Sequence, residues 1–110
     1  MNAKVRIDAG VCGFQTTARI ISEDNQNVTF DIESDCGKVR AFAGVLKKRG
    51  SVDAFQEIST ESESVVLSAA GKTLKGCCAA CAVPVGVFKA MQIAAGLALP
   101  QDIAIKLEKE

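Results

Sequence analysis

The hydrophobic pattern changes its period at Cys36, and this change limits the possible folds more than any other feature of the sequence. Before it, "AKVRID" at 3–8 and "VTFDIES" at 28–34 alternate apolar and polar residues, which is the two-residue period of half-buried strands. After it, residues 39–46 place apolar side chains three or four positions apart, as an amphipathic helix does. The order of strands first and helices afterwards predicts an α+β fold.

The N-terminal third predicts three antiparallel strands in a meander. A β-branched run, "TTARIIS" at 16–22, stands between the two alternating segments, and the polar "EDNQN" at 23–27 supplies a hairpin turn. At the other end of the chain, Ile103, Ile105 and Leu107 alternate with polar residues. This alternation predicts a further strand at 102–107, which would join the sheet.

Helices are expected between the meander and this last strand. The firmest is 36–48, which ends in the basic run "KKRG", and a short second helix is expected at 51–59. The apolar segment 64–72 fits either a buried strand or a helical turn. Pro84 suits the first turn of a final helix that ends near Leu99. We therefore expect one α+β domain over 1–110, with two or three helices packed on one face of a mainly antiparallel sheet.

Charge and composition argue against several classes of partner. The chain has 13 Lys and Arg against 13 Asp and Glu, so no overall field attracts nucleic acid or an acidic membrane surface. Five Phe are the only aromatic residues, which leaves few stacking platforms for bases. Charges at Lys4, Arg6 and Asp8 interrupt any signal-peptide core, and no apolar run is long enough for a spanning helix. A cytoplasmic, reducing location is expected.

The five cysteines all fall where strands end or helices begin. Cys12 lies in "AGVCGF", Cys36 in "SDCGKV", and Cys77, Cys78 and Cys81 in "KGCCAACAVP". A cysteine at a helix N-terminus meets free N–H groups, which favour the thiolate over the thiol. If these boundaries meet at one edge of the fold, three or four sulfurs could converge there, the number that zinc or an iron–sulfur cluster requires.

These placements predict a metal site formed by Cys12, Cys36, Cys78 and Cys81, which would bind zinc or an iron–sulfur cluster. The protein would then be a carrier that receives metal or cluster from a donor protein, or delivers it to an acceptor, and not an enzyme. Two alternatives remain open: Cys78 and Cys81 could form a thiol–disulfide redox pair, or the cysteines could be small apolar residues of a structural or partner-binding domain. The chain has no histidine, which excludes Ser-His and Cys-His nucleophiles.

Several short motifs carry a resemblance to known families. "CGF", "SDC", "C-x-x-C-x-V-P-V-G" and "LALP" resemble a family of small cysteine-containing proteins of anaerobic archaea and bacteria, for which no activity is established. More distantly, the order of parts is similar to the NifU/IscU-type iron–sulfur scaffold. That resemblance implies cluster ligands at Cys12, Cys36 and one of Cys77, Cys78 or Cys81. The chain differs from such scaffolds in having Phe14 where they commonly have Asp, and a cysteine where they have His beside the third ligand.

Overall fold

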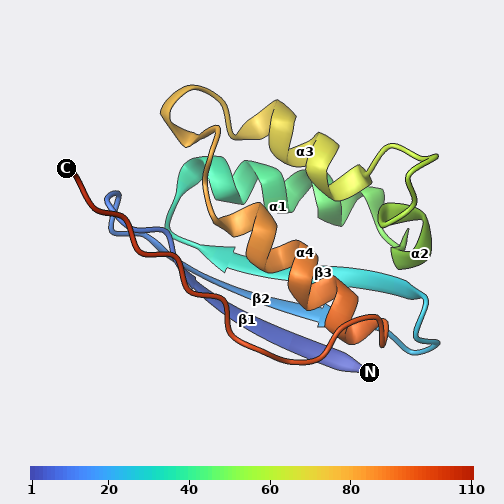
Figure 1. Ribbon diagram of the computed structural model, residues 1–110. Helices are drawn as coiled ribbons and strands as arrows, with labels where there is room; N and C mark the ends of the chain where they lie inside the picture. Colours follow the sequence, from blue (N-terminus) through green and yellow to red (C-terminus); the bar gives the residue numbers. More distant parts are fainter.

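The computed structural model describes residues 1–110 and contains a four-stranded antiparallel sheet with helices on one face (Figure 1). The strands are paired in the order β1-β2-β3-β4, so the sheet is a meander with β1 at one edge. Val5 pairs with Ala18, which pairs with Ile32, so residues that face the helices lie in register across three strands. The predicted α+β class and three-stranded meander are confirmed. The strands are β1 Asn2–Asp8, β2 Gln15–Ile21, β3 Asn27–Ser34 and β4 Val52–Asp53.

The fourth strand is not the one that the sequence indicates. The prediction of a strand at 102–107 is wrong, because residues 95–110 contain no helix or strand. The apolar side of this segment is not buried by any other element: Ile103 is 52% exposed, Ile105 71% and Leu107 90%. Alternation of residue type stabilises a strand only where one side is buried. Val52 is buried instead and pairs with Val28 at the opposite edge of the sheet.

The helices form two layers above the sheet. Helix α1 (Gly37–Arg49) lies on β3, and α4 (Val83–Ala94) lies on β1 and β2. Helix α3 (Val65–Thr73) packs on α1 and α4, so it lies farther from the sheet (Figure 1). A single turn, α2 (Ala54–Glu57), follows β4, and a short 3₁₀ turn (Gly76–Cys78) follows α3.

Most helix predictions are confirmed, with differences at the boundaries. The expected helix at 36–48 is α1, and the segment at 64–72 is helical rather than extended. The expected helix at 51–59 divides into β4 and α2, because Asp53 caps α2 with its carboxylate. The last helix ends at Ala94, before the expected end near Leu99.

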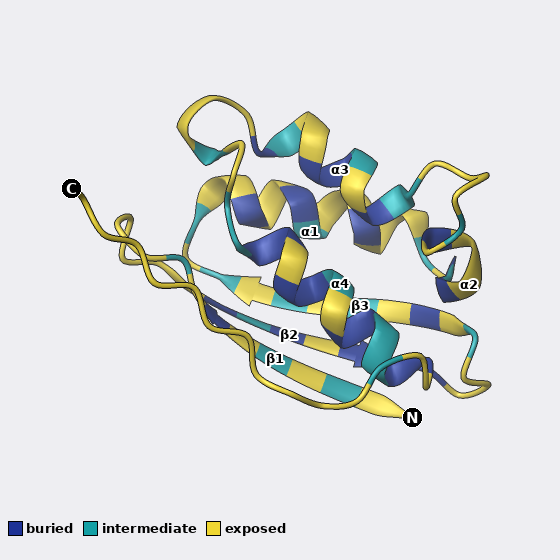
Figure 2. Cartoon of the chain, in the orientation of Figure 1, coloured by how far each residue is buried: buried dark blue, intermediate teal, exposed yellow.

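The core lies between the sheet and helices α1 and α4, and it extends to the buried side of α3 (Figure 2). Its largest fully buried side chains come from both layers, and burying each one stabilises the fold by roughly 1.5–3 kcal/mol. They include Ile20 and Val28 from the sheet, Phe42 and Leu46 from α1, and Met91 from α4.

Helix α4 approaches β1 through a glycine. A Cβ atom added at Gly86 would lie 2.6 Å from Ile7 Cδ1 and 3.4 Å from Val5 Cγ2. No side chain fits there unless Ile7 moves. Gly86 therefore sets the distance between α4 and the edge strand.

Helix α3 begins at a buried carboxylate. Glu57, only 5% exposed, accepts hydrogen bonds from the Val65 and Val66 N–H groups, both at 2.7 Å, and from Ser64 Oγ at 2.9 Å. Ser64 Oγ in turn accepts from the Leu67 N–H at 3.0 Å. The free amides of the first turn are thus satisfied by side chains, and the negative charge lies at the positive end of the helix dipole.

One stretch, Gly76–Ala94, is long and apolar enough to cross a membrane if only length and composition are considered. In the structure it comprises the 3₁₀ turn, a connection and α4. The apolar side of α4 is buried against β1 and β2, with Val83, Val87 and Met91 fully covered. Core packing therefore accounts for the hydropathy of this helix.

Candidate thiol site

All five cysteines lie at one end of the sheet. Cys12 is in the hairpin that joins β1 to β2, and Cys36 follows the end of β3, at the end where Thr16 pairs with Ser34. Cys77, Cys78 and Cys81 lie in the connection from α3 to α4, which Figure 1 shows on the same side as the start of α1. The meander, together with α3 running in the direction opposite to α1 and α4, places these distant parts of the sequence at the same end of the fold (Figure 1).

The five thiols differ in their exposure. All are free, Cys12 and Cys77 are exposed, and Cys36, Cys78 and Cys81 are half-buried. The three half-buried cysteines pack against the hydrophobic core. They therefore have one side fixed by the fold and one side open to solvent.

These thiols do not form a closed metal site. No three Cys, Asp or Glu side chains are grouped so that they could hold one metal ion. The donor set itself suits soft metals, since thiolates select zinc, copper(I) or iron–sulfur over magnesium or calcium. The thiols of the four predicted ligands are therefore donors of a suitable kind for a soft metal, but in the folded chain they are not grouped around one point. The four predicted ligands are Cys12, Cys36, Cys78 and Cys81.

The backbone around Cys36 is tightly fixed. Cys36 is the N-cap residue of α1, and its carbonyl accepts from the Arg40 N–H at 2.9 Å, the first hydrogen bond of the helix. Its own N–H donates to Ser34 Oγ at 3.1 Å. Two residues later, Lys38 Nζ donates to the carbonyl oxygen of Lys75 at 2.9 Å. This last bond ties the start of α1 to the connection that carries the other cysteines.

Cys78 and Cys81 lie at the two ends of one tight turn. The Cys81 N–H donates to the Cys78 carbonyl at 3.1 Å, which is the i to i+3 hydrogen bond of a β-turn. Such a turn holds its first and fourth Cα atoms within about 7 Å. Disulfides need Cα atoms about 4.4–6.8 Å apart, so this turn is compatible with a reversible Cys78–Cys81 bond.

The helices that begin at this end lack side-chain caps. Neither α1 nor α4 has a capping side chain or an acidic residue in its first turn, whereas Asp53 caps α2 and Ser64 caps α3. Cys36 is the N-cap residue of α1, and Cys81 directly precedes Ala82, the N-cap residue of α4. The positive ends of these two helix dipoles therefore have neither a capping side chain nor a first-turn carboxylate.

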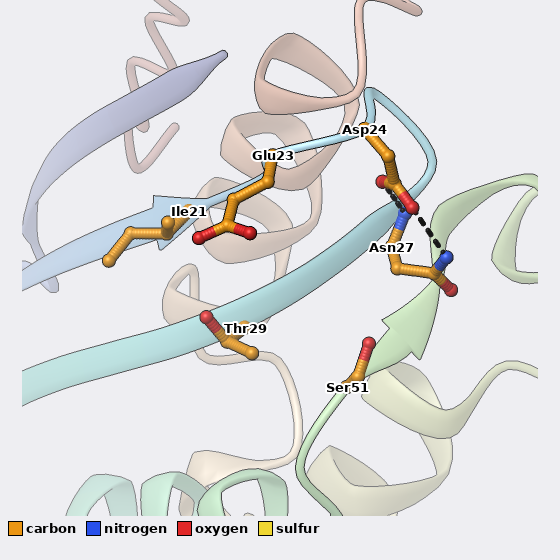
Figure 3. Close-up of a pocket in the computed structure, with 6 residues that line it drawn as sticks. All are labelled: Ile21, Glu23, Asp24, Asn27, Thr29 and Ser51. Atoms are coloured by element: carbon orange, nitrogen blue, oxygen red, sulfur yellow. Dashed lines mark hydrogen bonds between the residues drawn. The ribbon is translucent and has the colours of Figure 1, made fainter.

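A hollow of about 380 Å³ lies at the opposite end of the sheet, around the hairpin between β2 and β3 (Figure 3). It contains no cysteine. On its rim, hydrogen bonds from the Asn27 side chain and backbone, followed by the Gln26 backbone, lower the pKa of Asp24 from 3.8 to about 2. These bonds close the hairpin turn. The lining residues are Ile21, Glu23, Asp24, Asn27, Thr29 and Ser51.

Two residues near the thiols were not identified from the sequence. Thr16 is 2% exposed, and its hydroxyl donates to Ser34 Oγ at 2.9 Å, beside Cys36. The only feature of the sequence that points to them is that two hydroxyl residues, Thr16 and Ser34, occupy inward positions of alternating strands, where apolar residues are usual.

The family model described as "Family of unknown function (DUF6951)" matches residues 3–107. The chain belongs to this family. The match covers all four helices, the five cysteines and all of the four strands except Asn2, so the thiol-bearing end lies within the DUF6951 region. A search of curated proteins found no significant match, and neither did a search of solved structures.

Proposed function

We propose that this DUF6951 protein is a carrier that binds a soft metal ion or an iron–sulfur cluster as cargo through Cys12, Cys36 and Cys81, with Cys78 as a further ligand. The observation that carries this proposal is the placement of all cysteine-bearing segments at one end of the fold, where α1 and α4 begin without caps. Cysteine sulfur is the donor that zinc and iron–sulfur clusters require, so a group of cysteines at one end of the fold supports a site of this kind.

The open arrangement of the thiols fits cargo that is passed on better than a structural metal. A structural zinc site is closed and four-coordinate, and it supplies folding energy directly. Here the core is complete without metal, and Cys12 is exposed on a hairpin. Gly10 (φ 91°) and Gly13 (φ 74°) flank this cysteine. Movement of the hairpin toward Cys36 and Cys81 would complete the ligand set. The reverse movement would expose the cargo again for transfer.

The proposal is tested by loading the protein under anaerobic conditions, separately with Zn²⁺ and with iron and sulfide, followed by metal and sulfide analysis. We expect Cys12→Ser, Cys36→Ser and Cys81→Ser each to lose most of the bound metal, because each removes one of few ligands. Cys77→Ser is the matched control and should retain it. Retained binding in both Cys12→Ser and Cys36→Ser would overturn the proposal.

The β-turn that joins Cys78 to Cys81 supports a second candidate, a thiol–disulfide redox protein. One thiolate would attack a protein disulfide to give a mixed disulfide and release one thiol. The other would then attack the mixed disulfide, so two electrons pass to the substrate and a Cys78–Cys81 bond forms. This activity would tolerate Cys12→Ser and Cys36→Ser and would be lost in Cys78→Ser or Cys81→Ser. Reduction of a disulfide substrate by the metal-free protein separates the two candidates.

We propose a reducing, cytoplasmic compartment, because an odd number of cysteines, five, fits thiols or metal ligands better than a disulfide framework. The partners of a carrier would be a donor and an acceptor of metal or cluster. Nothing in the charge balance of 13 cationic against 13 anionic side chains favours nucleic acid or a membrane surface as a partner. If no metal, cluster or disulfide substrate reacts with the thiols, the cysteines are packing residues of a structural domain.

A further inference from the structure

The face of the sheet that the helices do not cover carries a shallow hollow of about 280 Å³. Helices α1 and α4 lie on the other face, so the hollow is open to solvent (Figure 1). Its lining side chains are all polar or charged, and they come from three neighbouring strands. The lining residues are Lys4 and Arg6 of β1, Thr17 and Arg19 of β2, and Asp31 and Glu33 of β3.

The charges of this hollow are separated by sign. One row across the sheet places Lys4 beside Arg19 and Arg19 beside Asp31. The next row places Arg6 and Glu33 on either side of a threonine. Strands β1 and β2 thus present three cations, and β3 presents two carboxylates. Like charges directly opposite each other destabilise a strand pair, so the position of Lys4 beside Arg19 costs the sheet stability.

The cations of the hollow have no hydrogen-bond partner within the protein. Among the lysine and arginine side chains, only those of Lys38 and Arg40 donate hydrogen bonds to other groups of the chain, and both lie in the first turn of α1. The side chains of Lys4, Arg6 and Arg19 are exposed. Their N–H groups are therefore free to bind a group that arrives from solution.

We propose that this hollow binds a small zwitterion, with its anionic oxygen group against Lys4, Arg6 and Arg19 and its ammonium group against Asp31 and Glu33. Arginine donates paired hydrogen bonds to carboxylate or phosphate oxygens, and carboxylates accept hydrogen bonds from ammonium groups. Neighbouring strands are about 4.8 Å apart, so the two charged groups of the ligand lie about 5–10 Å from each other. The hollow contains no cysteine, so this inference does not depend on the proposed function.

The size and charge of this face favour a small zwitterion over other occupants. Three strands of about seven residues cover roughly 340 Å². A stable protein interface needs about 800 Å² from each partner, so the face is too small to hold a second copy of the chain. A simple anion would meet the three cations but would also lie close to two carboxylates, whereas a zwitterion complements both signs.

The test compares three compounds of the same chain length: 6-aminohexanoate, hexanoate and hexylamine. Each is titrated into the ¹⁵N-labelled protein, and binding is followed by NMR. We expect 6-aminohexanoate to shift the amides of β1, β2 and β3 around the hollow in a saturable way, with an affinity about twofold to fivefold higher than that of either singly charged compound. Added salt should weaken this binding. Equal affinity for hexanoate would disprove the role of the carboxylates, and the absence of saturable shifts with 6-aminohexanoate would overturn the site.

Single substitutions then assign the two ends of the ligand. Arg19→Gln should weaken binding of 6-aminohexanoate by about twofold or more without weakening that of hexylamine, and Asp31→Asn should weaken both amines without weakening hexanoate. Arg49→Gln is the matched control, because it removes the same charge from the end of α1, outside the hollow. All three side chains are exposed, so the variants should fold. If Arg49→Gln weakens binding as much as Arg19→Gln, the overall charge and not the hollow attracts the ligand, and the inference fails.

Discussion

The carboxylate of Glu57 gives the sharpest test of how this fold is held together. It is 5% exposed and accepts three hydrogen bonds at 2.7–2.9 Å, two of them from the first amides of α3. Glu57→Ala leaves the buried Val66 N–H without a partner, at about 1–3 kcal/mol. The half-buried Val65 N–H and Ser64 hydroxyl can turn partly to water and add less. With the lost charge–dipole interaction, we expect the free energy of unfolding to fall by about 3–5 kcal/mol.

Glu57→Gln separates the charge from the shape of the side chain. Glutamine keeps one acceptor oxygen and nearly the same volume, so we expect a loss of only about 1–3 kcal/mol. Glu61→Gln is the matched control, since this exposed glutamate makes no side-chain hydrogen bond and should change stability by less than about 0.5 kcal/mol.

Urea unfolding followed by circular dichroism gives the three free energies, and hydrogen exchange at Val65 and Val66 reports the start of α3 directly. Both amides should exchange faster in Glu57→Ala than in Glu61→Gln. If Glu57→Ala unfolds at the same urea concentration as Glu61→Gln, the buried carboxylate does not hold α3, and the capping argument is refuted.

Three other perturbations test separate parts of the structure. Gly86→Ala should destabilise the protein by about 1–3 kcal/mol, because the added Cβ would lie 2.6 Å from Ile7 Cδ1 and 2.7 Å from Ile7 Cγ1. Ile7→Ala removes both of these atoms, so the double variant should lose less stability than the sum of the two single losses, and additive losses in urea melts would contradict the close approach. Phe42→Ala should lower the unfolding free energy by about 3–5 kcal/mol, and a loss below about 1 kcal/mol would show that the site is not core. Because the folded pKa of Asp24, about 2, lies below its ordinary value of 3.8, its hydrogen bonds stabilise the fold above about pH 4, and this contribution disappears as pH falls through 2. An NMR titration should return Asp24 toward 3.8 in Asn27→Ala, and an unchanged value would disprove the assigned cause.

Local pattern was sufficient for the meander and for α1. The alternation at 28–34 is repeated in the structure as one buried and one exposed side of β3, and the helical spacing of Val39, Phe42 and Leu46 is the buried side of α1. Each of these elements has one buried face, and the spacing of its apolar residues marks that face in the sequence. The pattern at 102–107 is equally regular, yet no strand forms, because its apolar side chains stay exposed and local sequence does not specify whether another element covers them.

The thiol-bearing end was only partly predictable. The positions of Cys12, Cys36 and Cys81 at element boundaries follow from local sequence, and an antiparallel meander brings such boundaries to one end. How far apart the sulfurs lie depends on the shape of the hairpin and of the connection before α4, which no periodicity specifies. The hydrogen bond between Thr16 and Ser34 depends on strand register, because slippage by one residue would move the two side chains to opposite faces.

The position of β1 at the edge of the sheet has a consequence for solubility. An edge strand leaves a row of backbone N–H and C=O groups that another chain can extend, which is a common route to aggregation. On β1, the exposed Lys4 and Arg6 alternate with Val5 and Ile7, which face the helices. If a second copy of β1 paired with this edge, its Lys4 and Arg6 would lie close to those of the first copy, and the like charges would repel each other. Exposed Lys4 and Arg6 on the edge strand therefore disfavour edge-to-edge pairing of two copies of the sheet.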